Sequence, residues 1–148
     1  MKPSPMDRAL EQARLAAARE EVPIGAVIVA ADGTVLAAEG NRTEERRDPT
    51  AHAELLAIRA AAATLAAPRL VDCDLYVTLE PCPMCAQAIS FARIRRLYYG
   101  AADPKGGGVD SGARIFDQSS CHHRPEVYAG IGESEAAALL RAFFQARR

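Results

Sequence analysis

The stretch DLYVTLEPCPMC, residues 74–85, changes from a strand pattern to a helix pattern within a few residues. From Leu75 to Leu79, apolar side chains recur at every second position, which is typical of a β-strand. The strand pattern leads directly into Pro81 and Cys82, and proline is favoured in the first turn of a helix. A strand followed by a helix is the repeating unit of α/β proteins, so this stretch predicts that fold class.

The sequence on both sides adds further elements to this unit. Asp32-Gly33 is a turn signal between two apolar runs, so an antiparallel hairpin is expected there. Asp48 is expected to cap a helix that has Pro49 in its first turn. The predicted elements are a helix over 6–19, strands over 22–29 and 35–41, a helix from Asp48 to near Pro68, a strand over 74–80, a helix from Pro81, a strand over 96–101, a glycine-rich loop over 103–112 and a final helix over 133–148.

Length and charge limit the class of protein. With 148 residues the chain has the usual size of one domain, so we expect a single domain over residues 1–148. A formal net charge of −1 does not mark the whole chain as a polyanion binder, so any contact with nucleic acid must be local. The sequence has neither a secretion signal nor a run of eighteen apolar residues, which predicts a cytoplasmic protein without membrane contact.

Two short motifs carry the residues that can do chemistry. In the PCPMC motif, Cys82 and Cys85 are three apart, so they share one face of a helix whose N-terminus favours the thiolate form. In the HAE motif, His52 and Glu54 project about 200° apart around a regular helix. They can meet at one ion only at a helix terminus, and the sequence predicts a helix start near this motif.

These residues predict a catalytic zinc site. His52, Cys82 and Cys85 supply three ligands, and three protein ligands leave the fourth tetrahedral position open for water. Zinc lowers the pKa of bound water to about 7, which gives hydroxide at neutral pH. Glu54 is the expected proton shuttle between that water and the substrate. We therefore expect hydrolysis by a zinc-bound hydroxide.

Simpler interpretations remain open at this stage. Cys73 or Cys121 could close a structural zinc site, or the thiols could simply be buried. Glu54 could stabilise a helix N-terminus through the helix dipole alone, and Asn41 could serve a turn. Phe143-Phe144 could pack the last helix onto the sheet.

The H-x-E and P-C-x-x-C motifs together are the signature of zinc nucleobase deaminases. The strings EVPIGAV (21–27), DPTAHAE (48–54) and LYVTLEPCPMC (75–85), with Asn41-Arg42, resemble the bacterial TadA-type tRNA-specific adenosine deaminases of the cytidine/deoxycytidylate deaminase superfamily. The likeness extends from Ala9 to Arg147. The run Gly106–Gly108 and the segment 111–123 depart from the family pattern.

The resemblance implies a cytidine-deaminase-like three-layer sandwich, in which a mixed sheet of about five strands lies between helices. It also implies a homodimer with one Zn²⁺ per subunit that hydrolyses the wobble adenosine of a tRNA anticodon stem-loop to inosine and ammonia. By position, the metal ligands would be His52, Cys82 and Cys85, the proton shuttle Glu54, the nucleoside contact Asn41, the loop contacts with RNA Asp103 and Lys105, and the anticodon-loop contact Phe144.

Two other functions share these motifs. Related deaminases that act on a free base or nucleoside, such as guanine or cytosine, also carry HAE and PCxxC. A zinc-stabilised RNA-binding module without catalysis would keep the metal ligands and need no proton shuttle.

Overall fold

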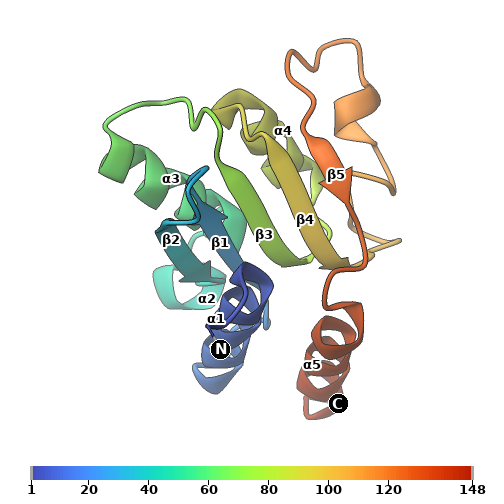
Figure 1. The fold of residues 1–148 in the computed structure, drawn as a ribbon. Helices are drawn as coiled ribbons and strands as arrows, with labels where there is room; N and C mark the ends of the chain where they lie inside the picture. Colours follow the sequence, from blue (N-terminus) through green and yellow to red (C-terminus); the bar gives the residue numbers. More distant parts are fainter. Residues whose placement is uncertain (1, 148) are drawn as a thin grey trace.

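A computed structural model describes residues 2–147 of the chain, and its centre is a five-stranded sheet (Figure 1). The elements in chain order are α1 Pro5–Ala18, β1 Gly25–Val29, β2 Val35–Gly40, α2 Thr43–Arg46, α3 Ala53–Leu65, β3 Asp74–Leu79, α4 Pro83–Ala92, β4 Arg96–Ala101, η1 Ile115–Asp117, β5 Glu126–Tyr128 and α5 Glu133–Gln145. The strand order is β2-β1-β3-β4-β5. β1 is antiparallel to β2 and β3, whereas β3, β4 and β5 are parallel, which confirms the mixed sheet expected from the resemblance.

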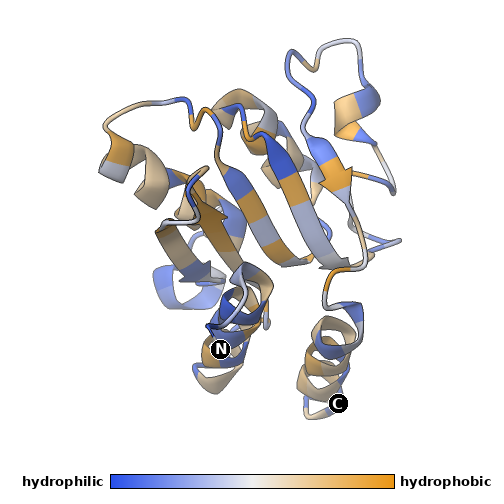
Figure 2. Cartoon of the chain, in the orientation of Figure 1, coloured by the Kyte–Doolittle hydropathy of each residue, from blue (hydrophilic) through white to orange (hydrophobic). Residues whose placement is uncertain are grey.

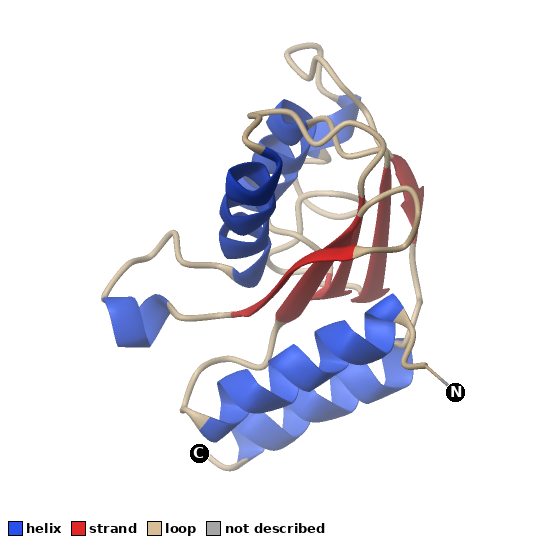
Figure 3. Ribbon diagram, turned by 60° about the vertical axis from the view of Figure 1, so that its left-hand side comes forward, coloured by secondary structure: helices blue, strands red, loops and turns tan. Residues whose placement is uncertain are grey.

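Helices cover both faces of this sheet (Figure 3). On one face, α3 and α4 pack against a core that includes Leu75, Ile89 and Leu97. On the other face, α1 and α5 lie side by side over a smaller core that includes Leu10 and Val27. The arrangement is the three-layer sandwich that the resemblance implies.

Strand β1 contributes residues to both cores. All of its residues are buried, because helices cover both of its faces. Figure 2 shows it hydrophobic along most of its length, whereas β3 alternates between hydrophobic and hydrophilic residues. A Cβ at Gly25 would lie 1.9 Å from the backbone oxygen of Ala9, so only glycine lets α1 approach this closely.

The hairpin and the strand-to-helix step at residues 74–85 form as predicted, but the start of the second predicted helix is wrong. Asp48 does not cap it: the Asp48 carboxylate accepts hydrogen bonds from the amide and hydroxyl of Thr50, at 2.8 and 2.7 Å. This local turn uses the side chain that would have capped a helix. The helix α3 begins at Ala53, with His52 as its N-cap residue.

The helix α2 and the strand β5 were not predicted from the sequence. The short helix α2 and the strand β5 lie in stretches without a clear period, and β5 has only 3 residues. Helix α5 ends at Gln145, and the predicted extension to Arg148 reaches outside the described residues. Within residues 2–147 no helix is both long and apolar enough to cross a bilayer.

Candidate metal centre

The two motifs meet because each of them opens a helix. His52 is the N-cap residue of α3 and Cys82 is the N-cap residue of α4, and both have an extended backbone. Neither side chain makes the capping hydrogen bond to its own helix. The imidazole and the thiol are therefore free to face each other at the ends of two helices.

The separations among these side chains fit a tetrahedral zinc ion. The Nδ1 atom of His52 lies 3.7 Å from the Cys82 Sγ and 3.6 Å from the Cys85 Sγ. Zinc bonds of about 2.1 Å to nitrogen and about 2.3 Å to sulfur, at the tetrahedral angle, would put those atoms about 3.6 Å apart. The ligand atoms of all three residues lie within 4.8 Å of one another. These three residues lie close enough together to hold one ion.

Among residues 2–147, no fourth protein ligand joins this group. In the part of the chain that the structure describes, His52, Cys82 and Cys85 form the one group of metal-type side chains, and it contains neither Cys73 nor Cys121. The Cys73 thiol contacts the backbone oxygen of Val71 instead. The arrangement therefore fits an open, catalytic type of zinc site better than a closed structural one.

The charges at this corner suit a cation. A hydrogen bond from Cys85, then one from His52, lowers the pKa of Cys82 to about 4. The same pairing with Cys82, together with burial, raises the pKa of Cys85. The hydrogen bond to Cys82 raises the pKa of His52. The thiolate is the form of cysteine that binds a metal ion, so a lowered pKa at Cys82 suits a ligand.

Glu54 lies in the first turn of α3, two residues after His52, and is 4% exposed. Burial raises the pKa of its carboxyl to about 7. A carboxyl group with a pKa near neutrality can both accept and release a proton at physiological pH. The group lines the same cavity as His52 and Cys82, which is the position that a proton shuttle requires.

A cavity of about 200 Å³ opens beside these groups. It is smaller than the roughly 300–1,000 Å³ usual for pockets that take drug-sized ligands, which suits one flat base. Its lining comes from β3, from the ends of α3 and α4 and from the loop after β4. The lining residues are Ile24, His52, Glu54, Leu79, Glu80, Cys82, Asp103 and Gly106.

The four residues predicted to contact the substrate differ in their exposure and in whether they line the cavity. Asp103 lines the cavity, and its Oδ1 accepts a hydrogen bond from the Gly106 amide at 3.0 Å. Asn41 is nearly buried at the end of β2, and Lys105 is exposed in the loop after β4. Phe144 is 49% exposed on α5, far more than its neighbour Phe143. Of the four, only Asp103 is among the residues that line the cavity.

Glu80 also lines the cavity, and sequence reasoning missed it. It is only 2% exposed, although it follows the last residue of β3. The sequence gives one signal, a carboxylate directly before the PCPMC motif, but its partners lie more than 20 residues away. Those partners are not visible in any local pattern.

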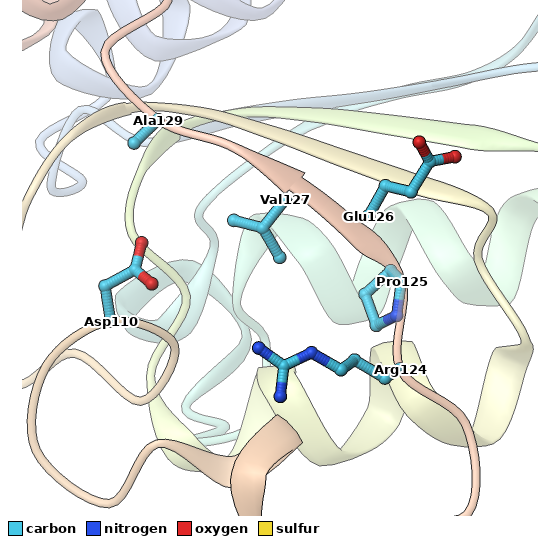
Figure 4. Close-up of a pocket in the computed structure, with 6 residues that line it drawn as sticks. All are labelled: Asp110, Arg124, Pro125, Glu126, Val127 and Ala129. Carbon is cyan, nitrogen blue, oxygen red and sulfur yellow. The ribbon is translucent and has the colours of Figure 1, made fainter.

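A larger pocket elsewhere is not the candidate site. It has a volume of about 490 Å³ and lies beside β5, where Arg124 and Asp110 face it (Figure 4). None of the residues that line it belongs to the metal-type group. We place the candidate site at the smaller cavity because the ligands and the carboxyl of raised pKa gather there.

Comparison with known proteins agrees with this geometry. Residues 2–101 match the family model of the cytidine and deoxycytidylate deaminase zinc-binding region. The chain therefore belongs to this family of zinc-binding deaminases.

Within the family, the chain is 62% identical to the tRNA-specific adenosine deaminase of Agrobacterium fabrum over 143 residues, which cover 97% of this chain and 93% of the relative. A solved structure from work on A-to-I editing by tRNA:A34 deaminases has a TM-score of 0.90 and 62% identity, and the match covers 92% of this chain and 98% of that one. The guanine deaminase structure from Nitrosomonas europaea is more distant, with a TM-score of 0.76 and 26% identity over 97% of this chain and 86% of that one.

Proposed function

We propose that this chain hydrolytically deaminates the wobble adenosine of a tRNA anticodon to inosine and releases ammonia. The observation that carries the proposal is the meeting of His52, Cys82 and Cys85 beside the Glu54 carboxyl in one cavity. The substrate rests on the 62% identity to a tRNA-specific adenosine deaminase over nearly the whole chain.

The three ligands would hold Zn²⁺, which as a Lewis acid makes water a nucleophile at neutral pH. Glu54 takes the proton of the attacking water and gives it to a ring nitrogen of the base. Glu54 then takes the remaining proton from the newly added hydroxyl group and passes it to the amino group, which leaves as ammonia when the carbon–nitrogen bond breaks. The product carries oxygen where the substrate carried nitrogen, so the reaction balances as adenosine plus water to inosine plus ammonia.

The small size of the cavity favours a base that has left its stack. Sequence-specific RNA recognition mostly targets single-stranded loops, whose bases can be splayed out. Enzymes that modify a base turn it into a pocket of matching size. We assign Asn41 to the extruded nucleoside, Asp103 and Lys105 to the RNA around it, and Phe144 to the anticodon loop.

A free base is the competing substrate, because the guanine deaminase from Nitrosomonas europaea has a similar fold. Its identity to this chain is 26%, against 62% for the tRNA-specific relative. The RNA substrate is therefore the better supported of the two. A non-catalytic RNA-binding module would have no use for the buried carboxyl of Glu54 beside the metal ligands.

We also propose one deaminase domain over residues 1–148 and a cytoplasmic homodimer with one zinc ion per subunit. An apolar groove between α3 and α4, lined in part by Leu55, Ile58 and Ala88, offers a surface for the second subunit. Phe91 lines this groove and is 62% exposed. Sedimentation equilibrium measures the assembly, and Phe91→Arg is expected to shift it to the monomer.

The decisive experiment is mass spectrometry of tRNA treated with the zinc-loaded protein. We expect inosine at the wobble position of one or more tRNAs and no xanthine from free guanine. Xanthine without inosine would identify a free-base deaminase, and zinc-loaded protein that forms neither product would exclude both reactions.

A further inference from the structure

Glu80 has a role that neither metal binding nor proton transfer explains. Its Oε1 accepts hydrogen bonds from the Asp103 amide and the Ser111 hydroxyl, both at 2.9 Å. Its Oε2 accepts hydrogen bonds from the amides of Val109, Asp110 and Ser111, at 3.1, 2.9 and 2.9 Å. Five donors from one loop therefore converge on a single buried carboxylate.

The loop wraps closely around that carboxylate. A Cβ at Gly107 would lie 2.5 Å from the Glu80 Cδ, and a Cβ at Gly108 would lie 2.5 Å from the Pro83 backbone nitrogen. Glycine at these positions lets the backbone come near enough for its amides to reach the carboxylate. Residues 102–114 contain neither helix nor strand, and the bonds to Glu80 hold them together with backbone hydrogen bonds such as the one from the Gly108 amide to the Pro81 oxygen.

The same contact shapes the cavity. Glu80, Asp103 and Gly106 all line it, together with His52 and Glu54. The hydrogen bond from the Asp103 amide joins the loop to the end of β3 inside this lining. Any shift of the loop would therefore move one wall of the cavity relative to the metal ligands.

We propose that Glu80 is a positioning residue, which fixes the loop 103–111 as a wall of the cavity and so determines how well the extruded nucleotide fits. The proposal rests on the proposed function, because the nucleotide is the substrate assigned there. Glu80 touches no reacting atom and acts through Asp103, whose amide it binds and whose side chain holds Gly106.

The variant Glu80→Gln tests this role because an amide cannot replace both carboxylate oxygens. If the amide oxygen takes the place of Oε2, it keeps the donors at 109–111, and the amide NH₂ then faces the Asp103 amide. Two donors cannot bond to each other, so the Asp103 amide loses its partner inside the protein. The damage is thus expected at the point where the loop meets the cavity.

The measurements are steady-state kinetics on an anticodon stem-loop RNA and residue-resolved amide hydrogen exchange. For Glu80→Gln we expect the KM to rise about tenfold, the size of one unsatisfied buried donor, while kcat falls much less. Bound zinc should remain at the wild-type level. The Asp103 amide should lose its protection from exchange.

A milder variant and a control keep the test clear if Glu80→Gln folds poorly. Ser111→Ala removes one of the five donors, so it should raise the KM about twofold and leave the fold intact. Glu135→Gln makes the same chemical change at an exposed residue of α5, which contacts Arg14, and should leave both kinetic constants unchanged.

The kinetic and exchange measurements together decide the role of Glu80. An unchanged KM with wild-type exchange at Asp103 in Glu80→Gln would overturn the proposal, as would a lower melting temperature with unchanged kinetics and exchange. Loss of protection at Asp103 together with a raised KM would support it. If the wild-type protein edits no RNA, the proposed function fails, and exchange at Asp103 still decides whether Glu80 holds the loop.

Discussion

The cavity has two buried glutamates, Glu54 and Glu80, and they differ in what surrounds their oxygens. Both are less than 5% exposed. Burial raises the pKa of Glu54 to about 7. Burial also acts to raise the pKa of Glu80, but hydrogen bonds from Asp103, Ser111 and Val109 outweigh it and hold this pKa below its usual value.

The difference shows that burial alone does not define the role of a carboxyl group. Glu80 is surrounded by amide donors, which favour its charged form and keep it a permanent acceptor. For Glu54, hydrogen bonds from its own backbone amide and from Cys85 do not outweigh burial, which raises its pKa to about 7. The Glu80 carboxylate is therefore held by hydrogen bonds within the fold, whereas the Glu54 carboxyl is available to transfer a proton. We expect a similar contrast between a functional and a structural residue for Cys85 and Cys73, and for Phe144 and Phe143.

Removal of a metal ligand should have the largest effect. For Cys85→Ala we expect loss of bound zinc and of detectable inosine, because two protein ligands hold zinc poorly. Metal analysis and mass spectrometry of treated tRNA measure both. Cys73→Ala removes a buried thiol outside the metal centre and should keep both zinc and activity. Equal zinc loss in the two variants would contradict the assignment.

Glu54→Gln should have the second-largest effect on activity. The amide cannot carry a proton between water and base, so we expect turnover to fall about 10²- to 10⁴-fold with zinc and fold retained. Single-turnover rates, zinc content and circular dichroism give the three readouts. A turnover close to that of the wild type would exclude Glu54 as the shuttle and remove its contrast with Glu80.

The phenylalanine pair extends the comparison to α5. Phe143 is buried, and the guanidinium of Arg147 lies 3.4 Å from its ring centroid, whereas Phe144 is half exposed. Phe143→Ala should lower the free energy of unfolding by about 3 kcal/mol. Phe144→Ala should leave stability nearly unchanged and weaken tRNA binding severalfold. Urea titration and RNA binding assays separate the two effects, and identical profiles would contradict the division.

Lys105→Ala should have the smallest effect. Lys105 is exposed on the loop that Glu80 holds, so its removal should cost no stability. If the ammonium contacts a phosphate of single-stranded RNA, the negative slope of log affinity against log salt should become less steep by about 0.7. Lys2→Ala, at an exposed position before α1, is the matched control. The same slope in both variants would place Lys105 away from the RNA.

Much of the fold and the chemical centre could be predicted from local sequence. The step from strand to helix at residues 74–85 and the Asp32-Gly33 turn follow from periodicity and turn chemistry, which act over a few residues. The start of α3 was misplaced because Asp48 and Pro49 are a good helix start and also a good turn, and local sequence does not decide between them. Strand β5 was missed because 3 residues carry no period.

By itself, the sequence determined which residues can bind a metal and that each motif opens a helix, since ligand type and spacing are local properties. Only the tertiary structure decided that His52 and the two thiols share one corner, that Phe144 and not Phe143 faces outward, and that Glu80 gathers the loop 103–111. The physical reason is that each of these facts depends on contacts between segments far apart in the chain. Such contacts are formed by the packing of helices and loops around the sheet, and no local pattern of residues records them.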